Sequence, residues 1–209
     1  MEKTQATDIR LGIQIEILSI LWMIIEMAVS IGAGFAARSV LLTAFGIDSL
    51  IELISAGILL WRLRVESQGG DVDQVEQAER RAGWIVAVTL GMLCVYVFVS
   101  AIYGLISHSK PEGTLLGITI CAAAVLIMPY LAVVKRGISG RIHSEALASD
   151  AIESITCAYM AGTVLTGLVL NALFGWWWVE NIAALVFLVW LARETWEAFE
   201  EAKAERNEE

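Results

Sequence analysis

The chain has 209 residues, of which 57% are hydrophobic, and its mean hydropathy is +0.68. Its 23 acidic and 14 basic residues give a formal charge of −9, a balance that argues against nucleic-acid binding. Three cysteines, Cys94, Cys121 and Cys157, lie far apart inside apolar runs, which argues against a disulfide framework. The composition predicts one compact helical membrane domain without a sizeable soluble module.

Six apolar runs are each long enough to cross roughly 30 Å of membrane hydrocarbon as an α-helix. The first run carries Glu16 and Glu26 and lacks an A-x-A cleavage site, so we interpret it as a retained span and not as a signal peptide. The predicted fold class is an all-α membrane protein. Residues 1–192 form its six-helix transmembrane domain, and residues 193–209 form a short acidic cytoplasmic tail. The predicted spans are about 12–34, 39–61, 83–107, 113–134, 144–170 and 177–192.

The basic residues predict the topology. If both termini are cytoplasmic, twelve of the fourteen Lys and Arg residues fall in inner segments, Lys135 among them, and only Arg38 and Lys110 fall outside. Short cytoplasmic loops carry such an excess of basic residues, so we predict a multi-pass protein of the inner (plasma) membrane. Glu16, close to the inner interface, is expected to be solvated.

Two acids lie deep in the second predicted span. A charged side chain at the centre of a membrane helix costs about 2.5–3.5 kcal/mol on insertion scales, so such acids usually face a cavity and serve a function. Asp48 and Glu52 are four residues apart, which places both carboxylates on one side of the helix, one turn apart. This spacing is typical of a pair that binds one ligand.

In the fifth predicted span, Asp150, Glu153 and Cys157 lie within two turns, and Glu153 and Cys157 share one face. Asp48 and Glu153 each lie nine residues, or roughly 14 Å, from the start of their spans, so both pairs reach the midplane. A divalent ion offsets the burial of two or more acids. The sequence predicts a midplane cation site with two ligands from each helix: Asp48, Glu52, Glu153 and Cys157.

These positions also have plainer interpretations. The acids could be protonated and form hydrogen bonds between helices, and Cys157 could be a small packing residue. Asp150 could be a ligand, a proton relay or an acid near the inner mouth. Glu26, deep in the first span, could join the site, carry protons or only pack.

The chain also resembles itself. Residues 48–57 align with residues 153–162, so that Asp48 superposes on Glu153 and Glu52 on Cys157. These segments are the middle spans of two three-helix halves with opposite orientation. The alignment suggests a 3+3 inverted repeat, an arrangement in which transporters bind their substrate near the midplane.

At these residues the chain resembles the cation diffusion facilitator family, whose second and fifth spans each carry a metal-ligand pair of the form [HD]xxxD. Residues 39–52 (SVLLTAFGIDSLIE) are similar to the second span of that family, with Asp48 and Glu52 on its ligand positions. Residues 146–153 (ALASDAIE) resemble the fifth span and put Glu153 and Cys157 on the other two. The sequences NALFGWWW at 171–178 and AAL at 183–185 also resemble the short bacterial branch of these transporters.

The resemblance implies efflux of a divalent transition metal, with zinc first and cadmium, cobalt, manganese or iron(II) as other substrates. It also implies a homodimer, no enzymatic activity and no cofactor apart from the transported ion. Glu153 replaces a histidine or aspartate of the family's pattern, and Glu52 and Cys157 replace aspartates, which leaves the metal open. The family's cytoplasmic domain is expected to be absent, because about 17 residues follow the last predicted span.

Carboxyls crowded in a low-dielectric site hold protons while no cation is bound. Because a metal needs deprotonated ligands, metal entry would expel protons and metal exit would readmit them, which predicts metal–proton antiport. Three alternatives remain: a non-transporting helical assembly or sensor protein, a transporter of another cation or of protons alone, and a membrane enzyme. The enzyme has no support in the sequence, since there is no G-x-S-x-G or H-E-x-x-H motif and no G-x-G-D around Asp48.

Overall fold

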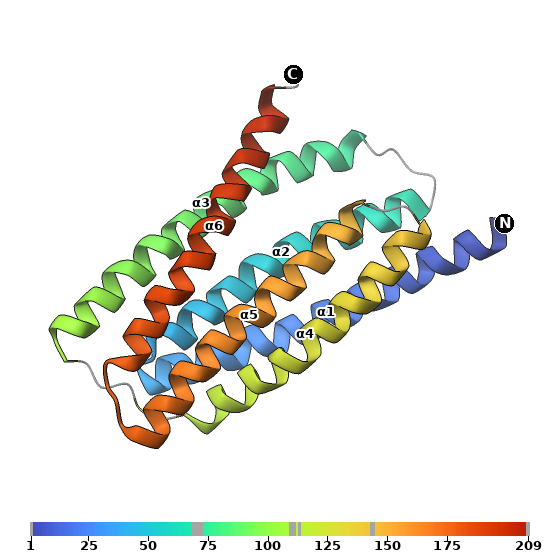
Figure 1. The fold of residues 1–209 in the computed structure, drawn as a ribbon. Coiled ribbons are helices and arrows are strands. Elements are labelled where there is room, and N and C mark those ends of the chain that lie inside the picture. Colours follow the sequence, from blue (N-terminus) through green and yellow to red (C-terminus); the bar gives the residue numbers. More distant parts are fainter. Residues whose placement is uncertain (1, 68–72, 109–111, 113, 143–144, 208–209) are drawn as a thin grey trace.

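The computed structural model describes residues 2–67, 73–108, 112, 114–142 and 145–207. Within these residues the chain folds into six long α-helices, which confirms the predicted all-α fold. Helices alternate in direction, so both chain termini lie toward one end of the bundle (Figure 1). The helices are α1 (Glu2–Ala37), α2 (Val40–Ser67), α3 (Asp73–Ile106), α4 (Leu115–Ile142), α5 (Glu145–Phe174) and α6 (Val179–Asn207).

Five of the described helices are long and apolar enough to cross a membrane, and α6, which includes Glu180, Arg193 and Glu194, is not among them. The predicted sixth span, 177–192, therefore stays a prediction. α6 also continues without a break past residue 192, where the sequence suggested that a tail begins. The five spans are Arg10–Ala37, Val40–Ile58, Ala87–Ile106, Leu115–Arg141 and Asp150–Phe174.

The six helices pack as a compact group of four with a pair against it (Figure 1). In the group, α1 packs on α2 and α4, and α5 packs on α4 and α2. α3 and α6 pack on each other and cover α2 and α5. Exchanging each helix for the one three places along the chain keeps these neighbours, as the inverted repeat predicts. One contact breaks the symmetry, because α2 also packs against α6, whereas α3 and α5 make at most marginal contact in the described residues.

The turn between α1 and α2 sets the register of these two helices. Arg38 has a positive φ of 53°, and the amide of Ser39 donates to the carbonyl of Gly34 at 2.9 Å. Ser39 then caps α2, because its hydroxyl accepts a hydrogen bond from the amide of Leu42 at 3.1 Å. The helices lie close together beyond the turn: a Cβ on Gly34 would meet the backbone nitrogen of Thr43 at 2.7 Å.

Apolar side chains cover much of the outside of the bundle, as lipid requires. Leu115 is 83% exposed, Leu126 75% and Val189 70%, while Glu26, Asp48 and other acids are buried between the helices. A bundle with an apolar exterior and acids inside is typical of a membrane protein whose polar residues line an internal site. The chain is a multi-pass membrane protein.

Candidate functional site

The two predicted acids of α2, which we call the α2 pair, are both buried. Asp48 is 1% exposed and Glu52 is 8% exposed. Both carboxylate oxygens of Asp48 and Oε1 of Glu52 are shielded from solvent and have no hydrogen-bond partner among the described residues. A buried carboxylate without a donor is unfavourable unless a proton or a cation neutralises it. Asp48 therefore lacks the partner that its charge needs, whereas the carboxylate of Glu52 lies within hydrogen-bonding reach of the thiol of Cys157.

Glu26 of α1 lies beside the α2 pair and receives three hydrogen bonds. Its Oε1 accepts from the hydroxyl of Ser49 at 2.8 Å and from the thiol of Cys157 at 3.6 Å, and its Oε2 accepts from the indole of Trp22 at 2.7 Å. Glu26 is fully buried. These contacts join α1, α2 and α5 at one depth, next to Asp48.

The three predicted residues of α5 lie in different surroundings. Cys157 is fully buried and faces Glu26. The side chain of Glu153 is exposed, although its carboxylate lies within electrostatic range of Glu52. Asp150 is buried and pairs with a lysine, as described below.

The predicted ligands lie in one region of the bundle, but their donor atoms do not converge on a single position where a metal ion could sit. Among the residues that the structure describes, no three His, Cys, Asp or Glu side chains are arranged so that they could hold a metal ion as they stand. Cys157 contacts Glu26 directly, and the carboxylates of Asp48, Glu26 and Glu153 lie within electrostatic range of Glu52. The arrangement gathers several acids around α2, and side-chain rotation would be needed to bring them onto a cation.

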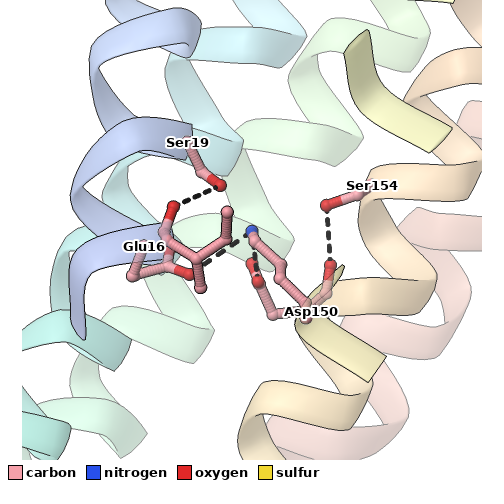
Figure 2. A network of polar contacts seen from close by, with 6 residues as sticks. Glu16, Ser19, Asp150 and Ser154 are labelled. Carbon is pink, nitrogen blue, oxygen red and sulfur yellow. Dashed lines mark hydrogen bonds and ion pairs between the residues drawn. The ribbon is translucent and has the colours of Figure 1, made fainter. Parts of the chain in front are cut away.

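A second group of buried charges, the lysine triad, lies farther toward the end of the bundle that carries the termini. Figure 2 shows that it joins α1, α4 and α5. The ammonium of Lys135, 1% exposed, contacts the carboxylate of Glu16 at 3.3 Å and also that of Asp150. Ser19 donates to the backbone carbonyl of Ile15 and Ser154 to that of Asp150, so neither hydroxyl bonds to a charged group of the triad. The triad is an ion pair with one surplus carboxylate.

The triad corrects two expectations from the sequence. Glu16 is not solvated, because its side chain is fully buried against Lys135. Lys135 does not lie in an inner connection, since α4 runs on to Ile142 and buries the lysine inside the bundle. Asp150, for which ligand, relay and inner-mouth roles were open, is held by this lysine.

Glu194 of α6 was not among the predicted site residues, yet its Oε2 is buried and has no hydrogen-bond partner among the described residues. Its carboxylate lies within electrostatic range of Asp48 and Glu52. A signal for this placement is present in the chain: Ala184, Phe187 and Leu191 are fully buried at helical spacing, and Glu194 continues their stripe. The acidic composition after residue 193 masked that periodicity.

A cavity of about 260 Å³ lies between α2, α3 and α6 at the opposite end of the bundle. Glu180 forms part of its wall and accepts a hydrogen bond from Ser39. Arg38 and Asn181 also line it. The cavity is separate from the α2 pair, since its deepest α2 residue is Leu41.

Comparison with known proteins identifies the family. Residues 17–205 match the model of the cation efflux transmembrane domain. The manganese efflux system protein MneS of Bacillus subtilis is 21% identical over 189 residues, which cover 89% of this chain and 65% of that protein. The uncharacterized transporter sll1263 of Synechocystis is 24% identical over 84% of this chain and 58% of its own length.

The cation-efflux pump FieF of Cronobacter sakazakii is 23% identical over 79% of this chain and 56% of its own length. The chain thus spans less than two thirds of each of these curated relatives. The match to the family model covers most of the chain and includes every predicted site residue. The chain belongs to the cation efflux family, whose members are membrane transporters and not enzymes.

Proposed function

We propose that this protein exports a divalent transition metal in exchange for protons, through a site at the α2 pair completed by Glu153 and Cys157 of α5. The observation that carries the proposal is Asp48, which is 1% exposed and has both oxygens without a hydrogen-bond partner in the described residues. Acids buried in membrane helices usually face a cavity and serve a function, and the chain belongs to the cation efflux family, which together support a binding role for Asp48.

Proton exchange follows from the surroundings of the site. Among the residues that the structure describes, the charged neighbours of Asp48 and Glu52 are other acids. While no metal is bound, protons therefore neutralise the two carboxylates. A divalent cation binds the deprotonated acids, so its entry releases those protons and its exit allows them to return. Glu26, held by Ser49, Trp22 and Cys157, is placed to position α5 against α2 or to pass a proton.

The donor atoms favour manganese as the metal, with zinc second. Carboxylate oxygens suit hard cations such as manganese(II), whereas a thiolate favours zinc. Asp48, Glu52 and Glu153 offer oxygen, and the thiol of Cys157 donates a hydrogen bond to Glu26. One of the relatives, MneS, is named as a manganese efflux protein. Zinc, which the family resemblance suggested first, remains the candidate in which Cys157 loses its proton and binds.

The setting of the transporter is part of the proposal. The positive-inside distribution of basic residues supports a plasma-membrane location with both termini in the cytoplasm. A homodimer is proposed from the family resemblance alone. Asp150 is assigned to the lysine triad and not to the metal site, because Lys135 already neutralises it.

The test is transport in proteoliposomes that contain a pH-sensitive dye, with manganese, zinc, cadmium, cobalt or iron(II) added outside. Wild type should show metal-dependent proton flux, and Asp48→Ala and Glu52→Ala should abolish it without loss of membrane insertion. Arg136→Ala, at an exposed position of α4, is the matched control and should transport like wild type. Retained flux in both acid variants, or no flux with any metal, would favour a non-transporting helical assembly instead.

A further inference from the structure

α6 brings an acid to the α2 pair that neither the family's ligand pattern nor the α2–α5 pairing supplies. Glu194 lies within electrostatic range of both Asp48 and Glu52, and its Oε2 is buried without a hydrogen-bond partner among the described residues. It reaches them through the α2–α6 contact, the one feature that departs from the symmetry of the two halves.

Helix register places Glu194 level with Glu52. The hydroxyl of Ser39, at the start of α2, donates to the carboxylate of Glu180 at the start of α6, so these two residues lie at one depth. α2 and α6 then run in the same direction. Glu52 lies thirteen residues beyond Ser39, or about 20 Å, and Glu194 lies fourteen residues beyond Glu180, or about 21 Å. The two acids therefore reach similar depths, one turn from Asp48.

The neighbours of Glu194 hold this part of α6 in place without neutralising the acid. The hydroxyl of Thr195 lies 3.3 Å from the sulfur of Cys94 on α3, which fixes the turn against the bundle. Arg193, the adjacent cation, is 70% exposed and pairs with Glu197 at 2.8 Å, and the carboxylate of Glu197 lies within electrostatic range of Glu194. Like the oxygens of Asp48, the buried oxygen of Glu194 therefore has neither a hydrogen-bond donor nor a cationic side chain beside it among the described residues.

We infer that Glu194 is a further cation-binding residue of the site, a third carboxylate that α6 contributes to the α2 pair. The inference rests on the proposed function. With Asp48 and Glu52, Glu194 would surround a divalent ion with oxygen donors from two parallel helices, and such donors select manganese(II) or iron(II) over zinc. Binding would also draw α6 toward α2, so the ion would link the outer helix pair to the four-helix group.

Binding of manganese alone tests this without transport. The full chain in detergent is titrated with Mn²⁺, and the EPR signal of free Mn²⁺ gives the bound fraction. Glu194→Gln should weaken binding by at least about tenfold, the scale on which loss of a metal-site partner acts. Glu200→Gln, an exposed glutamate of the same helix, should bind like wild type. Wild-type affinity in Glu194→Gln would overturn the inference.

A second variant keeps the test decisive if Glu194→Gln folds poorly. Glu194→His replaces an oxygen donor by imidazole and should shift the ratio of zinc to manganese affinity toward zinc by about tenfold. An unchanged ratio would contradict a contact between residue 194 and the ion. Asp48→Asn separates the two proposals: if it abolishes binding while Glu194→Gln does not, only the role of α6 fails, and if wild type binds no metal, the proposed function fails.

Discussion

Two groups of buried acids in this protein differ in what balances their charge. In the lysine triad, Glu16 and Asp150 share the ammonium of Lys135, 1% exposed. In the α2 pair, Asp48 and Glu52 are equally deep, yet Asp48 has no donor in the described residues. The comparison teaches that burial of an acid does not by itself mark a binding site. The α2 pair differs from the triad in having no cationic side chain beside it in the described residues, and its proposed binding role rests on that difference.

The triad is also the better candidate for a structural role. It connects α1, α4 and α5 near the end of the bundle that carries the termini, and α2 and α6 are not part of it. The ammonium of Lys135 is part of the chain and connects those three helices, whereas a transported cation would bind the α2 pair and then dissociate. Substitutions in the two groups should therefore differ in their effects on stability and on metal binding.

Lys135→Met should destabilise the protein most, because it leaves two buried carboxylates without a counter-charge. The expected loss is about 3–5 kcal/mol, or roughly 6–20 °C in thermal denaturation of the detergent-solubilised protein. Arg136→Met, next to it but exposed, is the matched control and should change the melting temperature little. Adding Glu16→Gln and Asp150→Asn to Lys135→Met should restore part of the loss. An unaltered melting temperature in Lys135→Met would show that the triad contributes nothing to stability.

Manganese should stabilise the protein through the α2 pair. A ligand that binds the native state at a hundred times its Kd adds about 2.7 kcal/mol to the free energy of unfolding, which would raise the melting temperature of wild type by several degrees. Asp48→Asn should abolish the rise and Asp150→Asn should keep it. A metal-dependent rise of equal size in Asp48→Asn would place the bound ion elsewhere.

Without metal, Asp48→Asn should leave stability within about 1 kcal/mol of wild type, because the substitution removes no hydrogen bond. This small effect contrasts with the large loss expected for Lys135→Met at similar burial. Thermal denaturation in the presence of a chelator measures both. If Asp48→Asn were as damaging as Lys135→Met, the α2 pair would be structural and the comparison would fail.

Cys157→Ser should have the smallest effect on manganese. If the thiol only donates to Glu26, a hydroxyl can replace it, and manganese flux should stay within about twofold of wild type. Zinc flux should fall more, since zinc gains from a thiolate ligand. The ratio of the two fluxes in proteoliposomes measures the difference. A fall in manganese flux as large as that in zinc flux would contradict a role for Cys157 that is limited to its hydrogen bond with Glu26.

Local spacing was enough to predict the helices and the shared face of Asp48 and Glu52. The six apolar runs correspond to six helices, and the four-residue spacing of Asp48 and Glu52 already placed both on one face of α2. Their ligand role stays a prediction. The family followed from short segments around the same residues and is confirmed by a match that covers residues 17–205.

Pairings between distant helices were beyond the sequence. Glu16 and Lys135 are 119 residues apart, and only the crossing of α1 and α4 brings them together. The hydropathy pattern placed Lys135 in a connection because a lysine usually ends a span. The pattern holds no information about the two acids on other helices that neutralise this lysine inside the bundle. Glu194 was hidden in the same way, since its burial depends on the contact of α2 with α6.

Binding of Mn²⁺ to Asp48→Asn and to Asp150→Asn, followed by EPR in detergent, distinguishes the α2 pair from the lysine triad as the place where the cation binds. Each variant removes one buried carboxylate charge, the first from an acid without a partner and the second from an acid held by Lys135. Asp48→Asn should lose Mn²⁺ binding, and Asp150→Asn should retain it. Retained binding in Asp48→Asn with loss in Asp150→Asn would contradict the account and move the site to the lysine triad.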